Sequence, residues 1–458
     1  MMIRNLDKLV ENAASTETKA ARAIALELLE SGLKAANPKE AVMRHVLLEG
    51  NLLRVGNFKI NLLHISRIIA VGAGKATAAM SEALEAVLGE RITHGRINVP
   101  HSIADRTRLN RIVVNGAGHP IPDESGRRGA EEILRLASNL RKDDLLICLV
   151  SGGGSSLMPL PRPEIGLEDK QKTNDLLIKS GARINDINIV RKHLSSIKGG
   201  QLAKAAYPAT VLNLVLSDVV GDPLDSIASG PVVPDPSTYQ DAITVMQRYK
   251  IWEKCPPRVR RVLLAGKSGK LEETPKPGNK VFRKVHTSVV GSNRISCETI
   301  VHEARKKNMN TLLLSTHIEG EARHVGTLIG AIALEVGSTG NPVKKPGVVV
   351  GGGETTVTVR GKGSGGRNQE VALAASTKIS GTDGIAIACM DTDGVDGPTD
   401  AAGAIVDGAT TSRIGGLEKT IEFLEDNDSF RCFSRIGDLI LTGPTGTNVN
   451  DIIVAVVP

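Results

Sequence analysis

Glycine and serine residues follow directly on an apolar run in the sequence LLICLVSGGGSSL, which spans residues 145–157. The apolar part, Leu145–Val150, has the length and composition of a buried strand. Three glycines after a strand let the backbone turn sharply and approach a ligand closely, and the hydroxyls of Ser155 and Ser156 add donors. The segment therefore suits a phosphate group, and a plain glycine-rich turn between strand and helix is the structural alternative.

Two other segments repeat the pattern of a strand followed by glycines. They are IIAVGAGK at 68–75 and VVVGGGE at 348–354. In doubly wound sheets, ligands gather at the carboxyl ends of the strands, where such loops lie. Three loops of this kind favour an anionic, phosphorylated ligand over three unrelated turns.

Lys75 ends the first of these segments and precedes a helical pattern at 76–88. A lysine at a helix start opposes the helix dipole at a cost of up to about 1 kcal/mol, and a bound anion resolves that conflict. A lysine that points into solvent is the alternative. The loop departs from two common nucleotide motifs, because Ala76 replaces the Ser or Thr of a Walker A loop and Thr77 replaces the third glycine of a dinucleotide fingerprint.

Basic side chains are concentrated in DINIVRKHLSSIKGG, residues 186–200. On one continuous helix, Arg191, Ser195 and Lys198 share a face, and the two cations there suit a carboxylate or a phosphate. A solvated basic helix face is the competing interpretation. Arg367 lies in the glycine-rich GKGSGGRNQE, which either carries the arginine toward a transferring charge or forms a mobile exposed loop.

Carboxylates follow two further strand-like runs. Asp218 and Asp222 lie in LSDVVGD, and Asp391, Asp393 and Asp396 lie in DTDGVDG. Carboxylates at strand ends can hold Mg²⁺ or accept the proton of a hydroxyl group. The capping of helices and turns is the structural alternative, since acidic residues next to glycine fit that role equally well.

Composition limits the class of protein. A chain of 458 residues exceeds one usual core, so we expect two domains. Aromatic residues make up 2%, which argues against single-stranded nucleic-acid binding by base stacking. A net charge of +7 suits anionic metabolites and polynucleotides alike, so it decides little. The five cysteines are widely separated and predict neither a disulfide framework nor a zinc site. The start has no apolar signal region and no apolar stretch reaches about 18 residues, so we expect a cytoplasmic protein without membrane contact.

Strand-like and helix-like patterns alternate along most of the chain, which predicts a mostly parallel α/β sheet. Strand-like runs at 348–350 and 355–359 are too close together for a crossover helix, so we expect an antiparallel insertion there. The segment Lys267–Lys284 is polar and rich in Pro, Gly and charge, which indicates an exposed linker. We therefore predict domains at 1–284 and 285–458; a surface excursion within one domain is the alternative.

A series of motifs resembles the glycerate 2-kinase family, in the form that carries a C-terminal MOFRL domain. The resemblance spans nearly the whole chain. The motifs occur in the order VGAGKA, GHPIPDESG, SGGGSSL, INxVRKHLSxIKGGxLA, LSDVVGD, SGPVVPDPST, GGGETTVTV, GGRNQE, DTDGxDGPTDAAG and TGPTGTNVND.

The resemblance implies two α/β domains, the N-terminal one Rossmann-like with a mostly parallel sheet and the C-terminal one a mixed-sheet MOFRL domain. It also implies an active site in the cleft between them. The implied reaction is the ATP- and Mg²⁺-dependent phosphorylation of D-glycerate at its 2-hydroxyl, which gives 2-phosphoglycerate and ADP. By similarity, Lys75 and Arg367 match residues central to that cleft, and we expect them to stabilise the transferring group.

Phosphoryl transfer depends mainly on positioning the reactants and neutralising their charge, so the remaining assignments distribute these tasks over several residues. We expect Arg191 to orient the carboxylate of glycerate through a bidentate pair, with Ser155 and Ser156 also at the substrate. Asp218 and Asp393 are expected to hold Mg²⁺ or to orient the attacking hydroxyl, two roles that the sequence does not separate. The residues expected to bind ATP phosphates are Ser151, Gly152, Gly153, Gly154 and Lys198.

Two other functions remain open from the sequence. One is an NAD(P)H-dependent hydroxypyruvate reductase, a name that related sequences also carry, although the absent third glycine at Thr77 counts against it. The other is a non-catalytic protein that senses a nucleotide or sugar phosphate. The expected partner is the small molecule D-glycerate, with no nucleic acid and no membrane, and the sequence leaves a homo-oligomer open.

Overall fold

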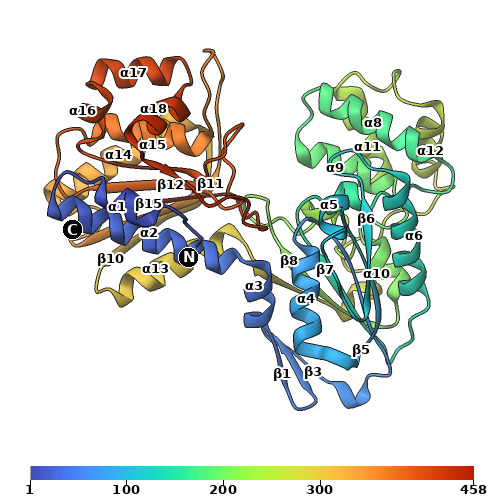
Figure 1. Cartoon of the computed structure of the whole chain (residues 1–458). Coiled ribbons are helices and arrows are strands. Elements are labelled where there is room, and N and C mark those ends of the chain that lie inside the picture. Colours follow the sequence, from blue (N-terminus) through green and yellow to red (C-terminus); the bar gives the residue numbers. More distant parts are fainter. Residues whose placement is uncertain (1) are drawn as a thin grey trace. The chain divides into compact units, whose positions relative to one another are not determined.

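The computed structural model describes residues 2–458, and its contacts divide the chain into two units (Figure 1). The central unit comprises Pro38–Val290. The terminal unit joins the start of the chain, up to Asn37, to Gly291–Pro458. Each unit has its own six-stranded sheet and its own apolar cores. Within the described part of the chain, no helix has the length and apolar character that crossing a bilayer requires.

Six strands form the sheet of the central unit in the order β6-β5-β4-β7-β8-β9. The ladders that join β6, β5, β4, β7 and β8 are all parallel, which confirms the predicted sheet type. Every residue of β4 and β7 is buried, as expected for strands with packed side chains on both faces. The strands are β4 (Ile68–Ala73), β5 (Ile92–Pro100), β6 (Ile112–Ala117), β7 (Leu145–Val150), β8 (Thr210–Leu216) and β9 (Val285–Gly291).

The order of strands reverses between β4 and β7. From β4 the chain continues to β5 and β6 on one side, whereas β7, β8 and β9 lie on the other. Ala73 and Val150, the last residues of β4 and β7, are register partners, so the two strands end at the same level. Doubly wound sheets bind their ligands at such a reversal. The loops that follow β4 and β7 therefore lie where this topology places a ligand.

Helices pack around this sheet, and four of them share a separate core. The helices α8, α9, α11 and α12 lie together (Figure 1), and apolar side chains such as Leu177, Val190 and Leu263 form their shared core. A small antiparallel sheet of β1 (Val46–Glu49), β2 (Leu52–Val55) and β3 (Phe58–Asn61) precedes β4. The helices are α3 (Pro38–His45), α4 (Thr77–Leu88), α5 (His101–Ala104), α6 (Glu124–Ser138), α7 (Gly154–Leu157), α8 (Leu167–Lys179), α9 (Ile184–His193), α10 (Gln201–Ala206), α11 (Tyr239–Arg248) and α12 (Pro257–Lys267).

The terminal unit is built on a mixed sheet in the order β10-β11-β15-β12-β13-β14, as the resemblance implies. Only the β10–β11 ladder is parallel, and the other ladders of the sheet are antiparallel. Val348 and Val350 enter one core while Val349 enters the other, so the strand period of two supplies both faces. The strands are β10 (Asn310–Glu321), β11 (Gly347–Thr356), β12 (Ala386–Asp391), β13 (Gly403–Asp407), β14 (Leu439–Ile440) and β15 (Asp451–Val457).

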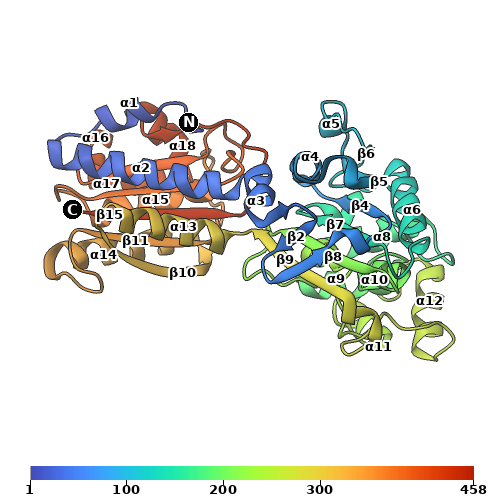
Figure 2. The same cartoon turned by 90° about the horizontal axis from the view of Figure 1, so that it is seen from below.

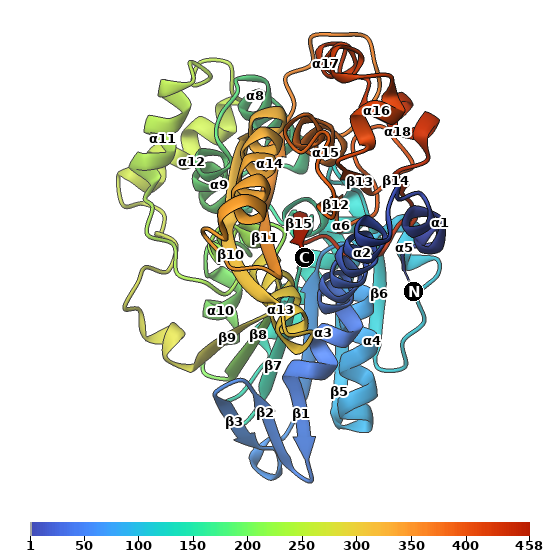
Figure 3. The ribbon, with the colours of Figure 1, turned by 90° about the vertical axis from the view of Figure 1, so that its left-hand side faces the viewer.

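Helices cover both faces of the terminal sheet. The first core contains residues of α2 and α13, which lie side by side (Figures 2 and 3). The second core contains residues of α14, α15 and α18. The helices are α1 (Leu6–Glu11), α2 (Thr16–Ala36), α13 (Asn293–Lys306), α14 (Ala322–Thr339), α15 (Arg367–Lys378), α16 (Thr410–Ile414), α17 (Leu417–Glu425) and α18 (Ser429–Ile436).

The expected antiparallel insertion at 348–359 is wrong. The run at 348–350 and the start of the run at 355–359 belong to one continuous strand, β11, which ends at Thr356. Its antiparallel partner is β15, from the end of the chain, and its parallel partner is β10. A strand of ten residues needs no crossover, and the glycines in its middle extend the backbone instead of turning it.

The predicted domain boundary also needs correction. The polar segment Lys267–Lys284 is an excursion within the central unit, because β9 follows it and lies next to β8 in the central sheet. The start of the chain belongs with the terminal unit, because α2 buries its apolar face against the terminal sheet. Arg22 of α2 fixes this packing: its fully buried guanidinium lies 2.7 Å from Asp407 and 2.8 Å from Asp438. Amphipathic periodicity in the sequence indicates a buried face but not the sheet that covers it.

We predict that Arg22→Met destabilises the protein by about 3 kcal/mol, because it leaves Asp407 buried without its main cation. Asp438 keeps its ion pair with Arg413, 2.6 Å away, and this pair limits the loss of stability. Urea unfolding measures the change. The control is Lys19→Met on the same helix, where the exposed pair with Glu11 predicts a change below about 1 kcal/mol. Equal stability of the two variants would contradict the assignment of α2 to the terminal unit.

Candidate active site

Two glycine-rich loops meet at the reversal of the central sheet. The N–H of Lys75, after β4, donates to the Gly152 carbonyl, after β7, at 2.8 Å. The N–H of Ala76 donates to the Ser151 hydroxyl at 3.0 Å, and this hydroxyl lies 3.2 Å from that of Thr77. Lys75 and the Ser151–Ser156 segment therefore lie together, as the proposed site requires. The Ser151 side chain is buried and is used to join the loops, so its side chain is not available to a phosphate.

Close approach explains why glycines occupy the second loop. A Cβ atom at Gly152 would lie 1.9 Å from the Asp218 carboxylate, so any other residue would displace that group. At Gly153, where φ is +78°, a Cβ would lie 3.0 Å from the His119 ring and 3.2 Å from Cγ of Lys75. Asp218, His119 and Lys75 are thus gathered around the same turn, from the ends of β8, β6 and β4.

His119 is a residue of this site that the sequence analysis did not assign. Burial, together with the positive charge of Lys75, lowers the pKa of the His119 imidazole below its usual value. The ring is therefore neutral near pH 7 and can accept a proton. Its place in the quoted motif GHPIPDESG, just after the strand-like run at 111–115, was the available signal.

The three residues expected at the substrate line one cavity. Arg191, Ser155 and Ser156 surround a cavity of about 40 Å³ together with residues of α8 and two prolines. The Ser155 hydroxyl lies 2.9 Å from that of Ser229, and the Ser156 hydroxyl donates to the Gly153 carbonyl at 3.0 Å. The full lining is Pro120, Pro122, Ser155, Ser156, Lys170, Thr173, Asn174, Leu177, Val190, Arg191 and Leu194.

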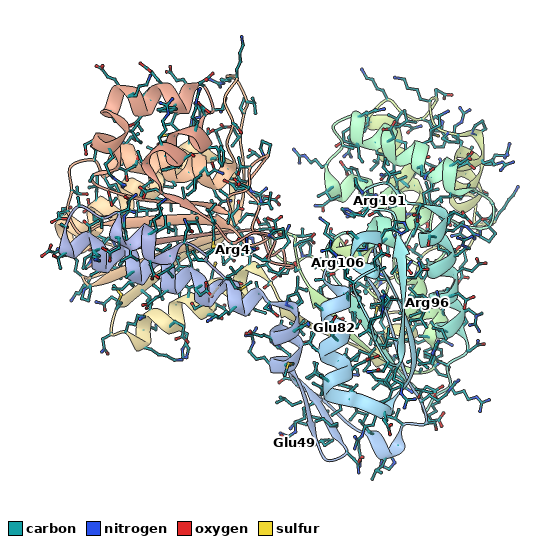
Figure 4. The ribbon with its side chains drawn as sticks, viewed as in Figure 1. Arg4, Glu49, Glu82, Arg96, Arg106 and Arg191 are labelled. Carbon is teal, nitrogen blue, oxygen red and sulfur yellow. The ribbon has the colours of Figure 1, made fainter. Side chains whose placement is uncertain are left out.

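Arg191 comes from α9 and is labelled in Figure 4. Its Nε donates to the Asn174 side-chain carbonyl at 2.7 Å, and its Nη1 donates to that of Asn188 at 3.4 Å. Both partners are neutral amides. Burial lowers the pKa of the Arg191 guanidinium to about 10, which still leaves it charged at neutral pH.

The expected single helical face of Arg191, Ser195 and Lys198 is wrong. α9 ends at His193, and the Ser195 hydroxyl donates to the Leu160 carbonyl in the following turn. Lys198 is not among the residues that line the cavity, but it is buried near Lys170 and Arg191, and burial together with their charges lowers its pKa well below the usual value. Tertiary packing of the turn after α9, and not a longer helix, therefore brings Lys198 near Arg191.

Two neighbouring basic residues have structural roles. Lys192 lies 2.9 Å from Asp225 and 3.4 Å from Asp235, and His193 lies 3.2 Å from Glu273. Lys192 and His193 thus have carboxylate partners, whereas Arg191 and Lys198 of the same basic segment form no ion pair among the described residues.

In the terminal unit, Arg367 begins α15 and is surrounded by carboxylates. Its guanidinium lies 2.8 Å from Asp451, 2.8 Å from Asp391 and 3.0 Å from Glu354. The glycine segment before it is anchored by hydrogen bonds, which disfavours the alternative of a mobile exposed loop: Lys362 N–H, for example, donates to Asp426 at 2.8 Å. The sequence analysis predicted Arg367 and noted Asp391 as a candidate carboxylate, but it did not predict that these three carboxylates surround the arginine.

One guanidinium cannot neutralise this group of carboxylates. Burial and the neighbouring charge of Asp451 raise the pKa of Asp391 to about 8. Burial also raises the pKa of Asp451 to about 7, although Arg367 opposes the shift. The two buried carboxyl groups thus titrate as a unit near neutral pH.

Asp393 and Asp218 belong to different units. The Asp393 carboxylate accepts the Val395 N–H at 2.8 Å, which is the turn-capping alternative to its expected role. Asp218 lies against Gly152 in the central unit, beside the loop expected to bind phosphates. Among the described residues, no three His, Cys, Asp or Glu side chains form a group that could hold a metal ion. Metal binding by these two aspartates stays a prediction.

We predict that stability falls as the pH rises from 5 to 8, and that Asp391→Asn weakens this dependence. A carboxyl whose pKa is raised to about 8 in the folded protein keeps a proton that the unfolded chain releases near pH 4. Its stabilisation is therefore full below pH 4 and is lost as the pH rises through 8, at up to about 1.4 kcal/mol per pH unit. Urea unfolding at several pH values measures the slope. An unchanged slope in Asp391→Asn, matching that of the exposed control Asp400→Asn, would refute the shifted titration.

Comparisons with known proteins fit this architecture. Residues 24–264 match the model of a domain of unknown function, DUF4147, and residues 347–451 match the MOFRL family. Glycerate 2-kinase of Pyrococcus horikoshii is 43% identical over 95% of this chain and 97% of its own length. The crystal structure of glycerate kinase from Thermotoga maritima, 38% identical, superimposes with a TM-score of 0.84 and covers 95% of this chain and 99% of that one. A relative from Agrobacterium vitis, 39% identical over 94% of this chain and 93% of its own length, is provisionally named as a hydroxypyruvate reductase. The chain belongs to the glycerate 2-kinase family.

Proposed function

We propose that the protein is a glycerate kinase that transfers the γ-phosphoryl group of ATP to the 2-hydroxyl of D-glycerate, with 2-phosphoglycerate and ADP as products. The observation that carries this proposal is the 43% identity with a glycerate 2-kinase across 95% of the chain. In the reaction, a bond forms between the 2-hydroxyl oxygen and the γ-phosphorus while the bond to the ADP oxygen breaks. The hydroxyl proton leaves to a base.

The central unit offers groups suited to each part of this chemistry. Phosphoryl transfer depends mainly on positioning and on neutralising charge. We assign the ATP phosphates to the Gly152–Gly154 backbone and Lys75, and the glycerate carboxylate to Arg191. Asp218 and the neutral ring of His119 lie around the same loop and are the candidates to accept the hydroxyl proton.

Mg²⁺ usually reaches such sites with the nucleotide and takes one or two carboxylates from the protein. Asp218 fits that need, because its carboxylate lies against Gly152 in the loop assigned to the phosphates. When bound, the ion supplies charge neutralisation at the phosphoryl oxygens. Asp218 also remains the group that could orient the hydroxyl, and its two roles are not separated here.

Arg367 has a different electrostatic setting from the one expected. Its charge is shared by three carboxylates, so its contribution to the transferring group must act together with them. Its catalytic role therefore stays a prediction, best examined with Arg367→Lys, which keeps the charge and loses the forked geometry.

The reductase alternative receives less support from the geometry. The third glycine of a dinucleotide fingerprint allows close packing of helix on strand. Here Thr77 occupies that place, is fully buried, and contacts Ser151 through its hydroxyl. The loop is thus built around a threonine side chain where dinucleotide folds require none.

The direct experiment supplies D-glycerate, ATP and Mg²⁺ and identifies the product by ³¹P NMR. We expect phosphate on the 2-hydroxyl with one ADP formed for each product molecule. ADP release without 2-phosphoglycerate would overturn the assignment. Oxidation of NADPH or NADH with hydroxypyruvate, in place of phosphorylation, would favour the reductase.

We predict that Lys75→Met lowers kcat/KM for phosphorylation at least about 100-fold, equivalent to about 2.7 kcal/mol of transition-state stabilisation. The lysine is exposed, so the melting temperature should hardly change. Steady-state kinetics measures the loss of turnover, and calorimetry measures any loss of ATP affinity separately. Lys179→Met, an exposed lysine of the same unit, is the matched control. Saturable ATP binding without turnover in the wild type, with a loss of ATP affinity alone in Lys75→Met, would favour the sensing protein.

A further inference from the structure

Lys170, on α8, is a buried lysine whose ammonium group has no partner in the described part of the molecule. The residue is 6% exposed, and its Nζ makes no hydrogen bond there. It lines the cavity that contains Arg191, Ser155 and Ser156. Burial of an unpaired ammonium is strongly unfavourable, so such a group either loses its proton or receives an anion from outside the chain.

The charges around Lys170 are also positive. Burial and the neighbouring Arg191 lower the pKa of Lys170 to about 7. The Nζ of Lys198 is likewise buried without a hydrogen-bond partner among the described residues. The polar partners of Arg191 are the amides of Asn174 and Asn188, which carry no charge. Lys170 and Arg191 therefore line one cavity, with Lys198 close to both, and no carboxylate among the described residues forms an ion pair with any of the three.

We propose that Lys170 completes a binding cavity for the carboxylate of the 2-hydroxy-acid substrate, with Arg191 as its second charged ligand and Lys198 as a supporting charge. This inference rests on the proposed kinase function and extends it to a residue that neither motif nor spacing identifies. The anion that binds in this cavity is thus the carboxylate of the organic acid and not a phosphate of the nucleotide.

The size and walls of the cavity favour the carboxylate over a phosphate chain. Its volume of about 40 Å³ accommodates roughly three water molecules, which is comparable to one carboxylate with the adjoining carbon. The apolar residues Leu177, Val190 and Leu194 line the same space and suit the carbon side of a short acid. A triphosphate has no apolar part to place against these side chains.

Specificity follows from the charge. A neutral polyol such as glycerol would leave Lys170 and Arg191 buried without an anion, so the site should reject it. D-lactate keeps the carboxylate and the 2-hydroxyl and should compete with D-glycerate. The cavity thus selects an acid by electrostatics and a short chain by volume.

The test compares Lys170→Met with Lys172→Met, an exposed lysine on the same helix. Affinity for D-glycerate, D-lactate, glycerol, inorganic phosphate and ATP is measured by calorimetry, and folding by the melting temperature. We expect Lys170→Met to lose at least 30-fold in affinity for both acids, to keep ATP affinity within threefold, and to melt no lower than the wild type. Lys172→Met should match the wild type throughout.

Three outcomes would overturn the proposal: acid affinity within threefold of wild type in Lys170→Met, a loss that falls on ATP instead, or wild-type binding of phosphate but of neither acid. If Lys170→Met does not fold, Lys170→Gln is measured against the same limits. Wild type that binds the acids through Lys170 but does not phosphorylate glycerate contradicts the proposed function alone. Turnover of glycerate with unchanged affinity in the variant contradicts the cavity alone.

Discussion

The contact between the loops after β4 and β7 is the constraint on which the central unit depends. At their closest point only glycine fits: a Cβ at Gly152 would meet the Asp218 carboxylate, and one at Gly74 would lie 2.0 Å from the Ser151 hydroxyl. This proximity lets Ser151 bond to the backbone at the start of α4 and holds Lys75 in front of that helix. Because β4 and β7 flank the reversal of the sheet, the same contact gathers groups from several strand ends around one turn.

The two units differ in the sign of the buried charge that lacks an opposite partner: it is positive at the cavity of the central unit and negative around Arg367 in the terminal unit. The cavity of the central unit contains buried cations without carboxylate partners, whereas Arg367 in the terminal unit has more carboxylates than one cation can balance. Buried charge of either sign is unfavourable unless something offsets it. We propose that an anionic substrate supplies that compensation in the central unit, whereas in the terminal unit burial raises the pKa of Asp391 and Asp451 and so favours their protonated forms.

The sequence predicted the features that depend on local pattern. Glycines after apolar runs located the loops at β4 and β7, and the alternation of patterns predicted the parallel sheet. Features set by tertiary packing were missed: Lys170 is an ordinary helical lysine until α8 packs beside α9 and buries it. Asp391 and Asp393 lie two residues apart, and only the end of β12 decides that Asp391 meets Arg367 while Asp393 caps a turn. The amphipathic pattern of α2 could not reveal that it packs with the distant end of the chain.

A crystal structure with D-glycerate and a non-hydrolysable ATP analogue tests the central claim most directly. The account predicts a carboxylate oxygen within hydrogen-bond distance of Lys170 Nζ and of the Arg191 guanidinium, with nucleotide phosphates against the Gly152–Gly154 backbone and Lys75. Glycerate bound with its carboxylate away from both cations, or phosphates that do not touch that loop, would contradict it.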